Sequence, residues 1–296
     1  MTASEDAGTA ARTVVERACR VLGLSAHGAE PVRMAENQIW RLPGRMILRI
    51  TRPGQMASAI REVAVAHWLA GQGVPAVRPL DVHQPVEVQG RPVTVWEELP
   101  PHQDGSATDV AGLLKQLHAL PIPEFPIGVL DPFVRLPERI AGATTLTGDD
   151  RAWLHGRLIE LKDAWSLRAA GLPHCVIHGD AWTGNVKRTA EGPVWLDLER
   201  FSLGPPAWDL ASTAVKLTTA GSVTADEYAA FCTVYGADVT RSDDYPLLSA
   251  AREFRMATYA AQHAGSNPAW HEEAQHRVGC LRGRNGPRPW HWTAIV

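Results

Sequence analysis

A loop in the second half of the chain carries the residues best suited to chemistry. A short apolar segment leads into His178-Gly179-Asp180, and the carboxamide of Asn185 follows five residues after Asp180. Asp197 then closes a second apolar segment. Carboxylate and amide oxygens are ligands for hard cations, and Mg²⁺ takes one or two carboxylates and completes its shell with water and phosphate oxygens. These residue types therefore predict a magnesium and phosphate site.

Two expected strands must position these groups. Residues 174–177 and 193–198 are short apolar runs typical of strands, and we expect them to pair as a hairpin. Such a hairpin would bring Asp180, Asn185 and Asp197 to one end. Because a single aspartate in a loop is usually a turn residue, the spacing of the three groups together is what favours chemistry.

Residues 1–99 are expected to form a small lobe that is rich in strands. Helical periodicity covers residues 4–22 and 56–70. Strand patterns cover residues 37–42, 46–50, 85–88 and 92–99, with turn signals at Pro43-Gly44 and Gln89-Gly90. Residues 100–105 are typical of a linker.

Residues 100–296 are expected to form a larger, mainly helical lobe. Helical patterns cover residues 107–120, 149–169, 206–218, 224–235 and 245–264. The segment 281–296 is rich in Arg, Gly, Pro and Trp and allows no assignment. The sequence thus predicts an α+β fold with two lobes, residues 1–99 and 100–296, and a ligand cleft between them.

The loop resembles the HGDxxxxN catalytic loop of the aminoglycoside phosphotransferase family. His178-Gly179-Asp180 and Asn185 carry the match, Asp197 is similar to the second metal-binding aspartate, and residues 204–211 (GPPAWDLA) are similar to the helix start G-[DP]-P-x-x-D-L-A. The resemblance covers about residues 30–265. It implies the protein-kinase-like fold, with a small antiparallel-sheet N-terminal lobe and a helical C-terminal lobe. It also implies transfer of a nucleotide γ-phosphoryl group to a small-molecule hydroxyl.

The resemblance implies a role for each matching residue. Asp180 would be the catalytic base that orients the acceptor hydroxyl and takes its proton, and Asn185 and Asp197 would be the Mg²⁺ ligands. Asp209 would be a structural carboxylate that ties the catalytic loop to its helix. His178 would be part of the scaffold.

Members of the family bind the α- and β-phosphates with a cation on a strand, which a helix glutamate holds. The usual cation is lysine, but residues 1–114 contain none. Arg49 matches the strand position and Glu62 the helix position. Arginine suits the task because its planar fork binds phosphate oxygens bidentately and stays charged. The alternative for Arg49 is a solvated strand residue.

The resemblance also implies a hinge that holds the nucleotide base. The backbone carbonyl of Glu97 and the backbone N–H of Leu99 would bind the purine of ATP or GTP. Backbone contacts leave no side-chain pattern in a sequence, so this expectation rests on the resemblance alone.

Composition excludes several other classes of protein. The chain is 45% hydrophobic and 21% charged, as in ordinary globular proteins, and has no apolar run of about 18 residues that could span a membrane. Its net charge of −3 argues against a nucleic-acid partner. The four cysteines form no CxxC pair, which argues against a disulfide scaffold or zinc ribbon. The polar start lacks the pattern of a secretory signal, so we expect a cytoplasmic protein without a membrane partner.

The acceptor is less constrained. Trp182, Glu199, Arg200 and Glu253 are the candidates to contact it. Residues 99–296 contain 18 basic and 22 acidic residues, and this net charge of −4 permits a polycationic aminoglycoside without demanding one. A neutral sugar, nucleoside or macrolide-like hydroxyl fits nearly as well. Because the resemblance covers antibiotic, sugar, choline and homoserine kinases, antibiotic resistance is one expected role among several.

Two other functions stay open. The first is a catalytically inactive relative that binds a nucleotide or metabolite, although the intact set of Asp180, Asn185 and Asp197 favours the enzyme. The second is a protein kinase, which is disfavoured because Leu198-Glu199 follows Asp197 where a DFG motif would continue.

Overall fold

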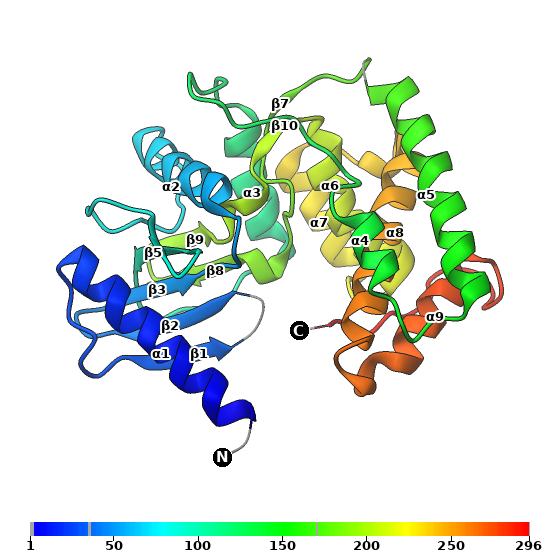
Figure 1. The fold of residues 1–296 in the computed structure, drawn as a ribbon. Coiled ribbons are helices and arrows are strands. Elements are labelled where there is room, and N and C mark those ends of the chain that lie inside the picture. Colours follow the sequence, from blue (N-terminus) through cyan, green and yellow to red (C-terminus); the bar gives the residue numbers. More distant parts are fainter. Residues whose placement is uncertain (1–2, 35–36, 170, 296) are drawn as a thin grey trace. The chain divides into compact units, whose positions relative to one another are not determined.

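The computed structural model describes residues 3–34, 37–169 and 171–295 and has a mixed α+β fold (Figure 1). It divides into two compact units, described separately below. Unit 1 comprises Met1–Gly105, Pro123–Ile127 and Gly184–Phe201, and unit 2 comprises Ser106–Ile122, Gly128–Thr183 and Ser202–Val296. The chain thus returns to unit 1 twice, whereas the lobes expected from the sequence, residues 1–99 and 100–296, are each continuous.

An antiparallel sheet with the strand order β1-β2-β3-β5-β4 forms the body of unit 1. The strands are β1 (Glu30–Met34), β2 (Gln38–Leu42), β3 (Met46–Ile50), β4 (Val86–Val88) and β5 (Arg91–Glu97). Gln89 and Gly90 both have positive φ, the geometry that a tight two-residue hairpin turn requires, and they join β4 to β5. The four strands predicted for this region are therefore confirmed, and β1 adds an edge strand.

Two helices cover opposite faces of this sheet. Side chains of α1 (Ala3–Leu22) pack in one core cluster with Leu48 and Ile50 of β3. Because successive strand residues alternate between faces, Arg49 points to the other face, where it bonds to Glu62 of α2 (Met56–Gly71). Both predicted helices are confirmed. Because side chains of β3 alternate between the two faces, Arg49 lies on the face that α2 covers.

Unit 1 contains a second, three-stranded antiparallel sheet with the order β6-β8-β9. Its strands are β6 (Gln103–Asp104), β8 (Val186–Thr189) and β9 (Gly192–Trp195). The expected linker 100–105 therefore contains a short strand. The predicted pairing of residues 174–177 with 193–198 is wrong, because β9 pairs with β8, the segment that directly precedes it.

Unit 2 is mainly helical. Its helices are α3 (Ala107–His118), α4 (Leu136–Ala141), α5 (Gly148–Ala169), α6 (Pro206–Val215), α7 (Ala225–Tyr235), α8 (Tyr245–Ala264) and α9 (His271–Leu281). Capping boxes at Ser106 and Thr224 begin α3 and α7, since each hydroxyl accepts a backbone N–H while an acidic side chain bonds back. The five predicted helices are confirmed, although α6 ends early and continues as the π-helical turn Lys216–Ala220. Within the described ranges, no helix is long and apolar enough to cross a membrane.

A two-stranded antiparallel sheet of β7 (Cys175–Ile177) and β10 (Ser202–Gly204) also belongs to unit 2. Its register places Ser202 opposite Ile177. β10 leads directly into α6, so this small sheet sets the loop that follows β7, residues 178–185, beside the start of α6.

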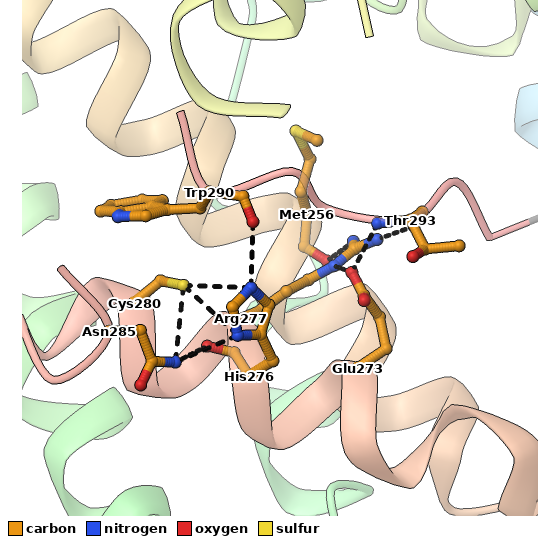
Figure 2. Close-up of polar contacts among 8 residues, drawn as sticks. All are labelled: Met256, Glu273, His276, Arg277, Cys280, Asn285, Trp290 and Thr293. Carbon is orange, nitrogen blue, oxygen red and sulfur yellow. Dashed lines mark hydrogen bonds and ion pairs between the residues drawn. The ribbon is translucent and has the colours of Figure 1, made fainter. Parts of the chain in front are cut away.

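The unassigned tail packs back onto α9, as Figure 2 shows, and its Trp290 and Trp292 share a core cluster with Ala257 of α8. Arg277 of α9 donates a hydrogen bond of 2.6 Å to Glu273 and a second one to the carbonyl of Thr293. Thr293 in turn donates its backbone N–H to Glu273 at 2.9 Å, and His276 Nε2 lies 3.0 Å from the Trp290 carbonyl oxygen. The described residues of the tail after α9 have no regular secondary structure, and hydrogen bonds to α9 hold them in place.

Candidate active site

A buried ion pair links the sheet of unit 1 to α2. Arg49 Nη1 donates a hydrogen bond of 2.6 Å to Glu62 Oε1, and both side chains are buried. The alternation of β3 aims Arg49 at α2, and Glu62 lies on the buried face of that helix. Arg49 is therefore a fixed, partnered cation, and the alternative of a solvated strand residue is wrong.

Two more carboxylates approach the same guanidinium. Arg49 Nη2 lies 3.2 Å from Glu199 Oε2 and 3.8 Å from Asp197 Oδ1. Arg61 of α2 donates to the Glu199 carbonyl at 3.4 Å, which fixes this segment against the helix. The cluster therefore gathers three carboxylates around one guanidinium.

This charge balance is visible in the pKa values of the pair. Burial raises the pKa of Glu62 to about 7, although Arg49 opposes the change, and Asp197 and Glu199 add to it. Burial alone would lower the pKa of Arg49, but the carboxylates, Glu62 first, raise it above its usual range. Burial is the main cause of the Glu62 shift, whereas the neighbouring carboxylates cause the Arg49 shift, so Arg49 keeps its positive charge in this cluster.

The β8–β9 hairpin places Asn185 and Asp197 at one end. Asn185 immediately precedes β8, Asp197 follows β9 by two residues, and the backbone N–H of Leu196 donates to the Asn185 carbonyl at 2.8 Å. Asp197 has φ 51° and ψ 70°, a left-handed conformation that is uncommon outside glycine and most accessible to Asn and Asp. Its side chain is 46% exposed, whereas Asn185 is buried.

The donor set at this end fits Mg²⁺. It offers one accessible carboxylate and one amide oxygen, and Mg²⁺ typically keeps water and substrate phosphates in its remaining positions. No group of three or more His, Cys, Asp or Glu suited to a metal ion occurs in the part of the chain that the structure describes.

A small hollow of unit 1 adjoins the ion pair. It is lined by Asn37, Arg49, Thr51, Ser58, Glu62 and Glu199, among others. Ala35 and Glu36, the neighbours of Asn37, lie outside the described residues. The guanidinium of Arg49 thus lines this hollow together with residues of α2.

The predicted hinge residues lie at the end of β5. Glu97 is the last residue of the strand and is paired with Met46, and its backbone N–H donates to the Arg78 carbonyl at 2.9 Å. Leu99 follows in a half-buried segment without regular secondary structure. The backbone N–H of Glu97 is thus already hydrogen-bonded within the protein. The group that we expect to contact the purine is the Glu97 carbonyl.

In unit 2, a buried carboxylate organises the loop that follows β7. Asp209 of α6 accepts the backbone N–H of His178 at 2.7 Å and that of Gly179 at 2.9 Å. The indole N–H of Trp208 donates to the Gly179 carbonyl at 2.9 Å. Gly179 has φ 82°, which suits glycine and allows this tight loop. The start of α6 thus determines the path of the chain into Asp180.

The charge of Asp209 is itself stabilised. Burial alone would raise its pKa, but the hydrogen bond from His118, with the charges of His118, His178 and Arg252, holds the pKa of Asp209 below its usual range. The His118 Nε2 atom lies 3.2 Å from Asp209 Oδ2. Asp209 is fully buried. These contacts agree with a structural role and leave no space for a ligand at this carboxylate.

Asp180 faces a cation from α8. Its side chain is 47% exposed, and Arg252 Nη1 lies 3.7 Å from its Oδ1 atom. Arg252 is buried, stacks 3.9 Å from the Trp208 ring centroid and donates to the Trp208 carbonyl at 2.8 Å. Burial lowers the pKa of Arg252, and Asp180 and Asp209 oppose this effect. The half-exposed carboxylate of Asp180 is thus positioned by a rigid, buried partner.

The four candidate acceptor residues occupy different surroundings. Trp182 lies in unit 2, with the Lys216 ammonium 4.5 Å from its ring centroid. Glu199 and Arg200 lie in unit 1, on the 3₁₀ turn Leu198–Arg200, where Glu199 contacts Arg49. Glu253 is buried in α8, bonded to Arg288 and Thr219.

Sequence reasoning missed two cations of unit 2, Arg252 and Lys216. Arg252 sits on the buried face of α8, and a charged residue in an apolar stripe was the available signal. Lys216 is one of four lysines in the chain, and it follows the helix whose start carries Asp209. Neither signal identifies a partner, because Asp180 and Trp182 are distant in the sequence.

Comparisons with known proteins agree with this architecture. A protein-family model described as "Phosphotransferase enzyme family" matches residues 29–254. A search of curated proteins finds no match.

Solved structures of the protein-kinase-like fold align over most of this chain. A choline/ethanolamine kinase family protein from Mesorhizobium loti aligns with TM-score 0.60 and 20% identity over 93% of this chain and 94% of its own. Amicoumacin kinase hAmiN aligns with TM-score 0.67 and 14% identity, over 90% and 95%. Aminoglycoside phosphotransferase APH(3'')-Id from Streptomyces rimosus aligns with TM-score 0.59 and 20% identity, over 82% and 97%.

These structural alignments establish the predicted fold, in which a small antiparallel sheet precedes a helical part. The family-model match spans more than half of the chain. The chain therefore belongs to the aminoglycoside phosphotransferase (APH) family of phosphotransferase enzymes, whose structural neighbours are small-molecule kinases.

Proposed function

We propose that the protein transfers the γ-phosphoryl group of ATP or GTP to a hydroxyl group of a small molecule. The observation that carries this proposal is the buried pair of Arg49 and Glu62, with Nη1 and Oε1 2.6 Å apart. Glu62 occupies one edge of the guanidinium, and phosphate oxygens, which arginine binds in a planar fork, would take the place of the 3.2 Å contact between Nη2 and Glu199. A chain without lysine before residue 115 would thereby obtain its phosphate cation from β3.

Three of the structural neighbours support a nucleotide donor. Amicoumacin kinase hAmiN was solved with AMP-PNP and Ca²⁺, and a spectinomycin phosphotransferase and the Streptomyces rimosus enzyme were each solved with ADP and their antibiotic. In this chain, the Glu97 carbonyl and the Leu99 N–H would hold the purine. We propose these two as backbone contacts.

Asn185 and Asp197 would hold Mg²⁺. When bound, the ion would neutralise charge on the nucleotide phosphates. The chain's own contribution is the β8–β9 hairpin, which presents an amide and a carboxylate at one end, and the left-handed backbone of Asp197, which turns the chain just after β9.

Asp180 would act as the base. Its half-exposed carboxylate is available to a ligand, and it would orient the acceptor hydroxyl and take its proton late in the reaction. Asp209 would keep the loop in place through the amides of His178 and Gly179. Most of the rate would then come from positioning and charge stabilisation rather than from a strong base.

The acceptor would be an antibiotic or another small alcohol, such as a sugar. Trp182, Glu199, Arg200 and Glu253 remain the proposed acceptor residues from the sequence. Glu253 is the weakest of them, since Arg288 and Thr219 already occupy its carboxylate. We also propose that the protein acts in antibiotic resistance and is located in the cytoplasm.

The test is a turnover screen with Mg²⁺ and ATP or GTP against aminoglycosides, nucleoside antibiotics, macrolides, sugars and amino alcohols. Asp180→Asn should lower kcat by roughly 10²–10⁴ and leave nucleotide binding intact, as expected for the loss of a general base. Asp163→Asn, an exposed change on α5, is the control and should leave kcat unchanged. Near-normal turnover by Asp180→Asn would refute the base, and nucleotide binding without any turnover would favour an inactive relative.

A further inference from the structure

Lys216 is a cation that the proposed reaction does not yet use. It begins the π-helical turn Lys216–Ala220, and its Nζ atom lies 4.5 Å from the Trp182 ring centroid. Among the residues that the structure describes, Nζ makes no hydrogen bond and no ion pair. An aromatic face attracts an ammonium group but satisfies none of its three N–H donors. The ammonium is thus held in place and still has donors to offer.

The backbone around Lys216 is held from several sides. The Thr219 carbonyl accepts the backbone N–H of Trp290 at 2.7 Å, and its hydroxyl donates to Glu253 at 2.5 Å. The backbone N–H of Ser222 returns to the Lys216 carbonyl at 2.9 Å. π-helical turns in proteins often coincide with functional sites. The tail and α8 therefore fix the segment from which the ammonium projects.

Three carboxylates of unit 2 are already engaged with other groups. Asp209 accepts two backbone amides, and Glu253 is bonded to Arg288. Asp180 pairs with Arg252 at 3.7 Å. Burial lowers the pKa of Lys216, and within the described residues Asp180 is the acid whose charge opposes this effect. Lys216 therefore adds positive charge beside the proposed base without a carboxylate of its own.

This arrangement selects among acceptors. A polycationic acceptor that placed a hydroxyl on Asp180 would bring its ammonium groups near Lys216 and Arg252, and like charges in a partly desolvated site repel strongly. An anionic acceptor would instead accept charge-assisted hydrogen bonds from the N–H donors of Lys216.

We propose that the acceptor is an alcohol that carries a carboxylate or a phosphate, and that Lys216 binds this anionic group while Asp180 orients the hydroxyl. The inference rests on the proposed function and narrows its acceptor class. It assigns Lys216 and Trp182 to one acceptor subsite of unit 2.

The first test measures anion binding without turnover. The chain has four lysines, so reductive methylation of each can be followed by mass spectrometry. Glycerate, glucose 6-phosphate, glycerol, glucose and glucosamine are the probes, at matched ionic strength. We expect the anionic alcohols to slow methylation of Lys216 several-fold relative to their neutral partners and to leave exposed Lys162 unaffected. Equal labelling of Lys216 with anionic and neutral probes would overturn the anion site.

Comparing the two anions distinguishes the two sources of charge. Protection by glycerate alone would assign a hydroxycarboxylate acceptor, and protection by glucose 6-phosphate alone would assign a sugar phosphate. Protection by glucosamine instead would overturn the inference, because the site would then prefer a cation.

The second test is kinetic and uses Lys216→Met, which keeps an apolar chain over Trp182 and removes the charge. It should raise the KM of an anionic acceptor roughly 10- to 100-fold, as the loss of a charged hydrogen bond predicts, while the KM values of neutral acceptors and nucleotide stay unchanged. Lys216→Arg should recover part of the loss, and Lys162→Met is the matched control. A fall in kcat alone, equal for all acceptors, would place Lys216 on the phosphoryl group and overturn the inference.

The two tests separate this inference from the proposed function. If no acceptor is phosphorylated by the wild-type protein, the proposed function fails, and the methylation experiment still decides whether Lys216 binds an anion.

Discussion

The Arg49 guanidinium donates a 2.6 Å hydrogen bond to the Glu62 carboxylate, and both side chains are buried. A β3 residue is thus fixed to an α2 residue, and its second terminal nitrogen, Nη2, faces Glu199 at 3.2 Å. A flexible lysine would make one point contact here, whereas arginine can bond to Glu62 and present further donors. The pair therefore defines both the place and the orientation of the proposed phosphate cation.

Arg49→Ala should raise the KM of the nucleotide roughly 10- to 100-fold, since charge-assisted hydrogen bonds to phosphate are lost. Arg49→Lys should retain much of the affinity, because the charge stays and only the fork is lost. Initial rates and calorimetric nucleotide titration measure the effect. Arg20→Ala, at an exposed position on α1 of unit 1, is the control. An unchanged nucleotide KM in Arg49→Ala would contradict the assignment.

Asp197→Asn should weaken metal binding and leave the fold intact. Asparagine tolerates the left-handed backbone of residue 197, so the substitution removes charge without adding strain. Loss of a ligand should reduce Mn²⁺ affinity in the presence of nucleotide at least roughly tenfold, because even outer-shell changes reduce metal affinity 10- to 100-fold.

Electron paramagnetic resonance of Mn²⁺ titrations measures this affinity. The control is Asp104→Asn, which removes a carboxylate bonded to Lys187 of β8 in the same sheet. Equal Mn²⁺ affinity for Asp197→Asn and wild type would remove Asp197 from the metal site.

Local patterns predicted most of the elements but not all of the strand pairing. β2 and β3 follow from the two apolar segments on either side of Pro43-Gly44, and α8 follows from a long run of residues with helical periodicity. β7, β8 and β10 are three or four residues long, too short for a periodic signal, so the partner of β9 was assigned wrongly. Asn185 and Asp197 still meet at one end, because the observed hairpin lies between them in the chain.

Some contacts of the proposed site could likewise be predicted from the sequence, and others could not. Arg49 and Glu62 follow from a family resemblance that specifies a strand position and a helix position, and the two side chains do form an ion pair. Arg252 beside Asp180 depends on contacts between distant segments, which no local pattern encodes. The tail allowed no assignment for a similar reason. Trp290 is buried because it packs against distant segments, and it belongs to no helix or strand whose pattern could be recognised.

Asp209→Asn should destabilise the protein by about 3–5 kcal/mol at neutral pH, because a buried charge partner is lost and one backbone amide loses its acceptor. The pKa of Asp209 is held below the unfolded value of 3.8, so the folded state binds fewer protons just below that value. Its stabilisation is therefore complete above about pH 4 and is lost as the pH falls through the lower folded-state pKa.

Urea denaturation of wild type and Asp209→Asn from about pH 3 to 7 should give a stability difference that shrinks toward the acid end. Asp163→Asn, in an exposed position on α5, should show no such trend. A difference that stays constant across this range would mean that the Asp209 charge does not contribute.

The last prediction concerns the pair that anchors the tail. Arg288 bonds to both oxygens of Glu253, at 2.9 and 2.7 Å, and the Glu253 side chain is only 2% exposed. Arg288→Ala would leave a buried carboxylate with Thr219 as its remaining partner. We expect a loss of about 2–3 kcal/mol in the free energy of unfolding, less than for a fully buried pair because 46% of the Arg288 side chain is exposed.

The double variant Arg288→Ala/Glu253→Gln should recover much of this loss, because no unpaired charge remains in the core. Arg284→Ala, which removes a half-exposed pair with Asp149 and Asp150, is the matched control and should change stability by at most about 1 kcal/mol. Chemical denaturation of wild type, Arg288→Ala, Glu253→Gln and the double variant completes the cycle. If the double variant is as unstable as Arg288→Ala, the tail is held by the packing of Trp290 instead of by neutralisation of Glu253.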